Sequence, residues 1–428
     1  MTTDHPSPVP RPSAAQLAWQ RLEFGVFFHV GVNTFAGKEW SDGTLAASSF
    51  APTQLDARQW VRVAKEAGAR YVVLTAKHHD GFCLWPTATT DYSVASSPWR
   101  GGQGDLVAEV AQACRAEGIG LGLYLSPWDR HAPEYPDPEA YDALYLAQLR
   151  ELCTNYGELV ELWFDGAGSA GRSYDWDAIM ALVAELQPGA MVFNMGTPTI
   201  RWIGNEDGLA ADPVRYAVDS ASLDNYTDTV VALGESRYVP PEADVSIRRG
   251  WFWAADDAPK SVEHLLAIYY RSVGLGANLL LNVPPDTRGL IDDADVARLR
   301  ELRAALDRRF GSPVPGVCEQ VADGVWQVHF DAPVTFDHLD LAEELGDGQR
   351  VVAHRVSVEG DELDGDVLLA EGGTIGHRRL HAHPPVTAQR LRVTCLGEGA
   401  RLAGVSVHHA GTHEVPQIEY LAPTDEPE

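Results

Sequence analysis

Between residues 24 and 310, short apolar runs alternate with longer stretches in which apolar residues recur every three or four positions. The short runs are typical of buried parallel strands, and the longer stretches are typical of the helices that connect such strands. The predicted strands are Phe24–His29, Tyr71–Lys77, Gly120–Tyr124, Leu159–Phe164, Met191–Phe193 and Asn278–Val283. The predicted helices are Leu55–Glu66, Asp105–Glu117, Ala140–Tyr156, Trp176–Leu186, Val262–Val273 and Asp292–Arg309. The pattern therefore predicts an α/β fold built from repeated strand-helix units.

This repeat is regular in its first four units and weakens after them. From Gly196 to Gly250 the sequence is loop-like and rich in Asp, Gly and Pro, which are residues of turns. The segment is too long for a simple connection between two elements. We expect a (β/α)8-like (TIM) barrel over residues 21–310 whose second half is irregular or lacks helices.

The pattern changes after Gly311–Pro315, a predicted linker. Strictly alternating runs separated by Gly, Asp and Pro turns predict an antiparallel β-sandwich as an accessory domain over residues 316–415. These runs are Val325–Phe330, Leu339–Leu341, Arg355–Val358, Arg390–Thr394 and Gly404–His408. We expect the polar, Pro-rich residues 1–20 and the tail 416–428 to be flexible.

Composition and charge narrow the possible partners. The chain has 428 residues, 45% of them hydrophobic, and a net charge of −28 that is spread along its length. Such an acidic surface is a poor partner for nucleic acid or an anionic membrane, and it favours a neutral ligand. The five scattered cysteines suggest reduced thiols, and no apolar run resembles a signal peptide or a membrane span. We therefore expect a cytoplasmic protein, and nothing in the sequence indicates an oligomeric state.

Polar and aromatic residues follow the predicted strands at the points where the strands end. In a parallel barrel the active site lies at these carboxyl ends. Donors, acceptors and aromatic rings together suit a ligand with many hydroxyl groups. The residues at the strand ends are His29, the run Lys77-His78-His79-Asp80, Tyr124 followed by Ser126-Pro127-Trp128-Asp129, and Trp163-Phe164-Asp165-Gly166.

Each of these residues also has a purely structural interpretation. His29 alone is equally consistent with a buried core histidine, and Asp165-Gly166 is a common turn dipeptide. His78 and His79 are adjacent and point to opposite faces of a regular strand, which makes a metal site there awkward. Most tryptophans are expected in the core, although a few, with Trp251 as a candidate, suit the apolar face of a sugar.

A glycoside hydrolase needs a second carboxyl group that donates a proton to the leaving oxygen. Glu206 lies in the polar segment Arg201–Gly208, whose Asn, Asp and Gly content is equally explained by turns. Glu39, in Lys38-Glu39-Trp40, is the competing candidate.

Several motifs together resemble one known family over nearly the whole chain, in order and in spacing. They are Phe24-Gly25-Val26-Phe27-Phe28-His29-Val30-Gly31, Glu39-Trp40, Ala76-Lys77-His78-His79-Asp80-Gly81-Phe82, Trp163-Phe164-Asp165-Gly166, and the run from Gly276 to Gly289. The chain is similar to glycoside hydrolase family 29 α-L-fucosidases. This resemblance implies that Asp165 is the nucleophile. It implies a fucose pocket lined by His29, Glu39, Trp40, His78, His79, Tyr124 and Trp163.

Two details refine the resemblance. Val30 stands where the commonest form of the family has Trp, so this chain lacks that ring at this position. The Gly204-Asn205-Glu206 loop and the Thr374-Ile375-Gly376 run resemble the subgroup that acts on branched α-1,3/1,4-fucosides, in which this Glu is the acid/base. We therefore rank Glu206 above Glu39 as the proton donor.

The resulting hypothesis is a retaining exo-α-L-fucosidase that acts on fucosylated, Lewis-type oligosaccharides by double displacement, without a metal or an organic cofactor. Three alternatives stay open. They are a broad-specificity α-L-fucosidase with Glu39 as acid/base, a zinc-dependent barrel hydrolase that uses the strand-end imidazoles, and a non-catalytic fucose-binding lectin.

Overall fold

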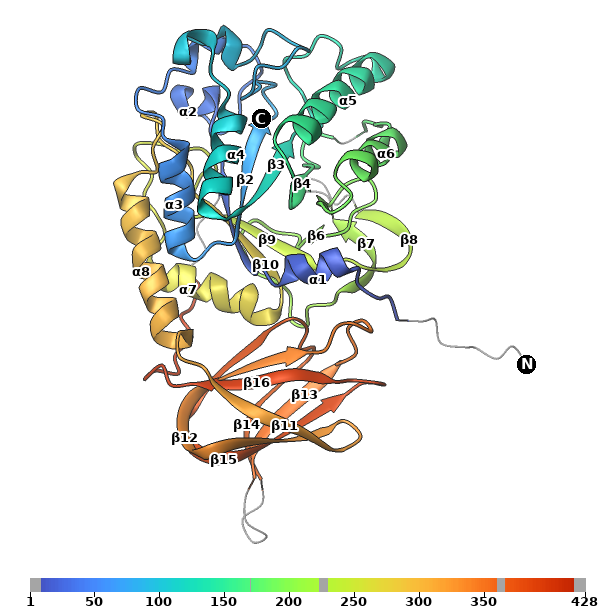
Figure 1. Ribbon diagram of the computed structural model, residues 1–428, viewed down its shortest axis with the longest axis vertical. Helices are drawn as coiled ribbons and strands as arrows, with labels where there is room; N and C mark the ends of the chain where they lie inside the picture. Colours follow the sequence, from blue (N-terminus) through green and yellow to red (C-terminus); the bar gives the residue numbers. More distant parts are fainter. Residues whose placement is uncertain (1–8, 170, 223–229, 360–365, 419–428) are drawn as a thin grey trace, which may run out of the picture.

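The computed structural model describes residues 9–169, 171–222, 230–359 and 366–418, and Figure 1 shows a barrel stacked on a domain of β-strands. The barrel strands follow the order β5-β4-β3-β2-β1-β10-β9-β6, and every neighbouring pair is parallel. A parallel bridge from Phe193 to Ile200, next to β6, nearly closes the ring. The bounds are β1 Phe24–Phe28, β2 Tyr71–Lys77, β3 Gly120–Leu125, β4 Glu161–Trp163, β5 Met191–Phe193, β6 Arg201–Trp202, β9 Pro241–Ser246 and β10 Asn278–Asn282. The predicted barrel is confirmed.

Helices cover the outside of the first half of the barrel. Most of the long helices begin after an aspartate whose carboxylate accepts hydrogen bonds from backbone N–H groups of the first turn. Within the described residues, the connections from β5 to β6 and from β6 to β9 contain no helix, so the second half is irregular as expected. The helices are α2 Val32–Ala36, α3 Ala57–Ala67, α4 Leu106–Glu117, α5 Pro138–Asn155, α6 Trp176–Leu186, α7 Val262–Arg271 and α8 Asp293–Phe310.

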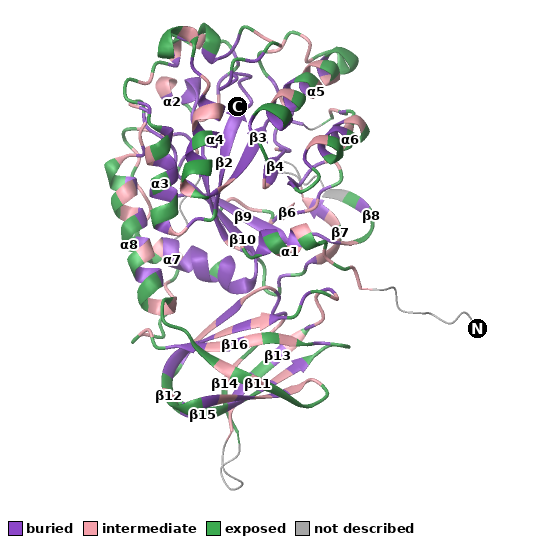
Figure 2. Cartoon of the chain, in the orientation of Figure 1, coloured by how far each residue is buried: buried purple, intermediate pink, exposed green. Residues whose placement is uncertain are grey.

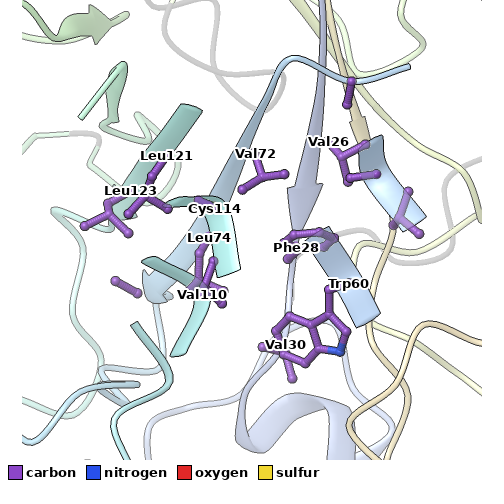
Figure 3. Packing of buried hydrophobic residues seen from close by; sticks show 14 of the residues in the cluster. Val26, Phe28, Val30, Trp60, Val72, Leu74, Val110, Cys114, Leu121 and Leu123 are labelled. Atoms are coloured by element: carbon purple, nitrogen blue, oxygen red, sulfur yellow. The ribbon is translucent and has the colours of Figure 1, made fainter. Parts of the chain in front are cut away.

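The main core lies between these helices and the outer face of the strands. Figure 2 shows the barrel strands as buried, and Figure 3 shows Val72 and Leu74 of β2 beside Val110 and Cys114 of α4. These side chains are at most 2% exposed. Burial of this kind stabilises a fold by about 25 cal/mol per Å² of apolar surface, and here it fixes the strand ends from which the functional side chains project.

The segment from Gly196 to Gly250 contains strands that the sequence pattern does not predict. Besides β6 and β9 it contains a two-stranded pair, β7 Ala217–Ser222 and β8 Val230–Tyr238. The prediction was wrong for β9 because this strand places Glu242 and Asp244 inside the barrel, buried to 0% and 3% exposure. Acidic residues at inward positions hide the apolar pattern of a buried strand. Residues 223–229 of the segment lie outside the described residues.

The N-terminus also differs from the expectation of a flexible segment over residues 1–20. Ser13 caps a helix, α1 Ala14–Gln20, through a capping box with Gln16. The Gln16 amide donates to the backbone oxygens of Thr199 and Tyr238, both at 2.7 Å, so α1 is held against the second half of the barrel. Residues 1–8 and 419–428 lie outside the described residues.

The C-terminal domain is an antiparallel sheet of order β11-β16-β12-β15-β13-β14 with an additional β11–β12 pairing. The long strands β12 and β15 change register between His329 and Val334 and pair with different neighbours at their two ends. They therefore contribute to both layers of a sandwich-like fold, as predicted. The bounds are β11 Val314–Ala322, β12 Val325–Glu343, β13 Ala353–Val358, β14 Val367–Gly372, β15 Arg379–Leu396 and β16 Leu402–His408.

The sandwich contacts the barrel at the amino ends of the strands. Arg378 forms an ion pair with Glu23, which directly precedes β1. Arg379 forms a bidentate pair with Asp212, with both nitrogen-oxygen distances at 2.8 Å. The sandwich is therefore at the opposite end of the barrel from the carboxyl ends of the strands. Among the described residues, no helix is long and apolar enough to cross a membrane.

Candidate active site

A cavity opens at the carboxyl ends of the barrel strands, where the sequence analysis expects the site. It holds about 580 Å³ of empty space, including its open mouth. Every predicted site residue except Glu39 lines it. The lining residues are Phe27, His29, Trp40, His78, His79, Tyr124, Trp163, Asp165, Ala167, Phe193, Trp202, Glu206, Asp244 and Trp251.

Asp165 lies just after β4, and its carboxylate is oriented by neighbours on two sides. The Tyr124 hydroxyl donates to Oδ2 at 2.9 Å, and the backbone N–H of Ala167 donates to Oδ1 at 2.9 Å. Nε2 of His79 lies 3.5 Å from the same Oδ2. Burial holds the pKa of Tyr124 well above its ordinary value, so the hydroxyl keeps its proton and remains a donor. Asp165 is thus fixed with its carboxylate facing the cavity.

Glu206 lies in the connection between β6 and β7 and has a different environment. Burial, reinforced by the negative charge of Asp165, raises its pKa to about 7. The indole N–H of Trp251 donates to Oε2 at 3.3 Å. Glu206 therefore carries a proton over much of the range below neutral pH. Two carboxyl groups in one cavity, one oriented by donors and one kept protonated, are the arrangement that acid and base chemistry requires.

His29 is held in one tautomer by its neighbour Asn282. The Asn282 amide donates to Oγ of Ser246 and to the backbone oxygen of Trp251, at 2.9 and 2.8 Å. Its oxygen therefore faces Nδ1 of His29, 2.8 Å away, so that Nδ1 must be the donor. Burial lowers the pKa of His29 to about 3, and its Nε2 is left as a neutral acceptor. A hydroxyl group of a ligand is the natural donor to such an atom.

The two histidines after β2 are also neutral near pH 7. Burial lowers the pKa of His79 to about 4 and that of His78 well below its ordinary value. Nδ1 of His79 lies 2.6 Å from Oγ of Ser126, which is also 2.6 Å from the backbone oxygen of Trp128. Neutral imidazoles suit an uncharged polyhydroxylated ligand, in agreement with the acidic surface of the chain.

Tryptophans supply the apolar walls of the cavity. The Trp163 ring stacks on Phe193 with ring centroids 3.8 Å apart and an interplanar angle of 10°. Its indole N–H donates to Oε1 of Glu242 at 2.9 Å, inside the barrel. Trp40 packs beside His79 and Trp128 at centroid distances of 4.9 and 5.3 Å. Such rings pack well on the apolar face of a pyranose.

Glu39 is placed differently from the other predicted site residues. Its carboxylate accepts hydrogen bonds from the backbone N–H groups of Trp251, at 2.7 Å, and Phe252, at 3.3 Å. It also lines a separate groove outside the central cavity. A carboxylate that serves two N–H donors is held as an acceptor, which does not suit a proton donor.

The sequence analysis missed five residues of the cavity wall. Phe27 and Phe193 belong to predicted strands, but inward orientation at a strand end is not visible in a continuous apolar run. Ala167 follows Asp165 by two residues, whereas Trp202 and Asp244 lie in the segment taken as a loop. The apolar Ala243 and Val245 that alternate with Asp244 are the signal that could have found β9. Within the described parts of the chain, no group of three or more His, Cys, Asp or Glu side chains is arranged to hold a metal ion.

Comparisons with known proteins agree with this geometry. A family model described as Alpha-L-fucosidase matches residues 44–309. The protein named Alpha-L-fucosidase 1 of Arabidopsis thaliana is 40% identical over 425 residues, covering 88% of this chain and 82% of that protein. A glycoside hydrolase 29 family member from an unknown rumen bacterium is similar in structure with a TM-score of 0.85 and 35% identity, covering 94% of this chain and 78% of that one. A GH29 fucosidase of Ruminococcus gnavus in complex with fucose has a TM-score of 0.81 and 29% identity, covering 95% and 97% of the two chains.

Proposed function

The chain belongs to the α-L-fucosidase family, glycoside hydrolase family 29, and we propose that it is a retaining exo-α-L-fucosidase acting on α-1,3- or α-1,4-linked fucose of branched oligosaccharides. One observation carries the proposal. The cavity brings together Asp165, which is oriented by Tyr124, and Glu206, whose pKa is raised to about 7, among neutral imidazoles and tryptophans.

The two carboxyl groups divide the reaction between them. Asp165 attacks the anomeric carbon of fucose while Glu206 donates its proton to the departing glycosidic oxygen, which leaves a fucosyl ester and the free acceptor sugar. Glu206, now ionised, takes a proton from a water molecule that attacks the same carbon and releases Asp165. Two inversions give net retention of the α configuration. Both steps use these two carboxyl groups, and the second step also uses one water.

Fucose recognition follows from the neutral acceptors and the aromatic walls. Nε2 of His29 accepts a hydrogen bond from a sugar hydroxyl, and the aromatic residues that line the cavity contact the apolar parts of the sugar. Hydrogen bonds that strengthen as the sugar becomes oxocarbenium-like lower the barrier by several kcal/mol in this class of reaction. The fucose complex of the R. gnavus relative supports fucose as the glycone.

Glu206 is a better proton donor than Glu39 on two grounds. It lines the same cavity as Asp165, and its pKa is raised by burial and by the charge of Asp165. Glu39 instead accepts hydrogen bonds from two backbone N–H groups. These contacts support the ranking of the two residues and hence the resemblance to the branched-substrate subgroup.

The linkage preference rests on the location of Glu206. The acid lies on the connection from β6 to β7, in the segment between β5 and β9 whose described residues include no helix. A second sugar that contacts this part positions Glu206 as it binds, so substrates without a branch lose turnover as well as affinity. Branched α-1,3/1,4-fucosides supply that second sugar beside the fucose.

The test is a comparison of initial rates on Lewis a or Lewis x trisaccharide and on 2′-fucosyllactose, with the anomer of the released fucose followed by NMR. We expect the Lewis trisaccharide to react faster by about tenfold or more and the α anomer to appear first. A preference for 2′-fucosyllactose would overturn the linkage while leaving the fucosidase activity in place. Initial release of the β anomer would overturn the retaining mechanism.

A further inference from the structure

Glu39 is hydrogen-bonded to the loop that follows β9 and that contains Trp251. Its backbone oxygen accepts a hydrogen bond from the buried Asn33 side chain of α2 at 3.2 Å. Its carboxylate extends from there to the backbone N–H groups of Trp251 and Phe252. The side chain therefore connects the segment after β1 to the segment after β9, which are far apart in the sequence.

Gly250 makes this contact possible. A Cβ atom at position 250 would overlap Oε1 of Glu39 and stand 2.9 Å from its Cδ. Gly250 is not among the glycines with positive φ, so the requirement is for space and not for an unusual backbone conformation. The Gly250 oxygen is also held by the Ser246 hydroxyl at 2.6 Å, so the loop cannot easily retreat from a new side chain.

Trp251 is hydrogen-bonded both to Glu39 and to Glu206, so it links the two residues. Its N–H is held by Glu39 and its backbone oxygen by Asn282, so both sides of the residue are fixed. Its indole ring lies 5.1 Å from the His29 ring, and its indole N–H donates to Glu206. A shift of the Trp251 backbone therefore moves the donor that orients the acid.

We propose that Glu39 is a positioning residue that, seated against Gly250, holds Trp251 and thereby orients Glu206 for proton transfer. This inference rests on the proposed function of Glu206. It separates two roles for Glu39, because a residue that contacts fucose affects sugar binding, whereas a residue that acts through Trp251 affects proton donation. Misplacing a catalytic group by about 1 Å costs roughly a hundredfold in rate.

The experiment changes each partner of the contact in turn, with the variants Glu39→Ala and Gly250→Ala. Lys38→Ala is the matched control, because Lys38 is exposed and directly precedes Glu39. We measure kcat/KM on a Lewis trisaccharide and on an aryl fucoside with a good leaving group, together with inhibition by free L-fucose. In both variants the value on the trisaccharide should fall by roughly ten- to a hundredfold. The value on the aryl fucoside and the inhibition constant should change by less than about threefold, because that leaving group needs little protonation.

If Gly250→Ala fails to fold, Trp251→Phe tests the second contact of this chain of interactions, because it keeps an aromatic ring but removes the indole N–H donor together with the second ring. It should show the same selective loss. Four acidic residues lie near Glu206, and they are Asp165, Asp207, Glu39 and Asp244. Their negative charges favour the protonated form of Glu206, whereas the hydrogen bond from Trp251 lowers the pKa of Glu206. Removal of the N–H should move the alkaline limit of kcat/KM to higher pH.

Two results would overturn the inference. If Glu39→Ala weakens inhibition by L-fucose about tenfold or more while Gly250→Ala behaves like the wild type, Glu39 contacts the sugar directly. If kcat/KM of the variants falls equally on the Lewis trisaccharide and on the aryl fucoside, the contact between Glu39 and the loop has only a general structural role. Failure of the wild type to release fucose from any substrate would refute the proposed function itself, which makes the two failures distinguishable.

Discussion

The two halves of the barrel position their functional side chains in different ways. In the first half, β1 to β4 end directly in the cavity, and His29, His79, Tyr124 and Asp165 follow from strands that are flanked by helices. In the second half, the described parts of the connections from β5 to β6 and from β6 to β9 contain no helix, and Glu206 comes from one of these connections. Under the proposed function, the group that bonds to fucose is on the half whose strands are followed by helices. The proton donor is on the half where hydrogen bonds between loops replace helix packing, and that half is where substrate fit can influence catalysis.

The largest effect should come from removing Asp165, the proposed nucleophile, in the first half. Asp165→Gly should fold and lose roughly 10⁴-fold or more in turnover, on natural and activated substrates alike, because every substrate must form the same fucosyl ester. Azide, which fits the vacated space, should restore part of the activity on an aryl fucoside. Steady-state rates with and without azide are the measurement. Near-normal activity in purified Asp165→Gly would falsify the assignment of the nucleophile.

Removal of Glu206, the proposed acid of the second half, should have an effect that depends on the leaving group. Glu206→Ala should lower kcat/KM on a Lewis trisaccharide by about 10²- to 10⁴-fold and spare an activated aryl fucoside far more. The pKa of Glu206 is raised to about 7, and the acid works only when protonated. Wild-type kcat/KM on the trisaccharide should therefore be retained below this pH and be lost as the pH rises through about 7.

Glu235→Ala provides the matched control for Glu206→Ala, because Glu235 of β8 is exposed and lies outside the cavity wall. It should keep wild-type selectivity between the two substrates. If kcat/KM of Glu206→Ala falls equally on both substrates, Glu206 has a role in binding. The second half of the barrel would then not supply the proton donor.

The same contrast explains which elements the sequence predicted. Strands β2 and β5 and helix α6 have the predicted bounds because each is a clear apolar run or a clear helical repeat. Strand β9 was missed because buried carboxyl groups occupy its inward positions, where the indole of Trp163 is a partner of Glu242, and only the alternating Ala243 and Val245 indicate a strand in the sequence.

The candidate site shows the same division. Residues that directly follow a strand, such as Asp165, are placed by the strand, so the sequence pattern was enough to predict that they lie at the mouth of the barrel. The orientation of Glu39 depends on the absence of a side chain at Gly250, more than two hundred positions away, and no local pattern contains that information. Sequence reasoning was therefore most informative where local structure positions the side chain and least informative where loops meet.

A pair of buried glutamates links the two halves below the cavity and supports a last, smaller prediction. Glu161 of β4 and Glu242 of β9 are both 0% exposed. Glu242 accepts hydrogen bonds from the Tyr71 hydroxyl at 2.6 Å and from the indole of Trp163 at 2.9 Å. Oε1 of Glu161 is buried with no donor near it, which suits a protonated oxygen that donates to Glu242. Burial and the charge of Glu242 raise the pKa of Glu161 well above its ordinary value.

The folded protein therefore binds a proton at Glu161 that the unfolded chain releases above about pH 4.3. A raised pKa in the folded state stabilises the fold at low pH, and this contribution is lost as the pH rises towards the raised value. In Glu161→Gln the amide N–H donates as the protonated carboxyl does, but it does not titrate. The difference in melting temperature between this variant and the wild type should therefore shift in favour of the variant as the pH rises from 5 to 8. Glu242→Gln places an N–H group against existing donors and should cost about 1–3 kcal/mol at both pH values. Identical, pH-independent shifts in the two variants would contradict the assignment of the proton to the β4 side of the pair.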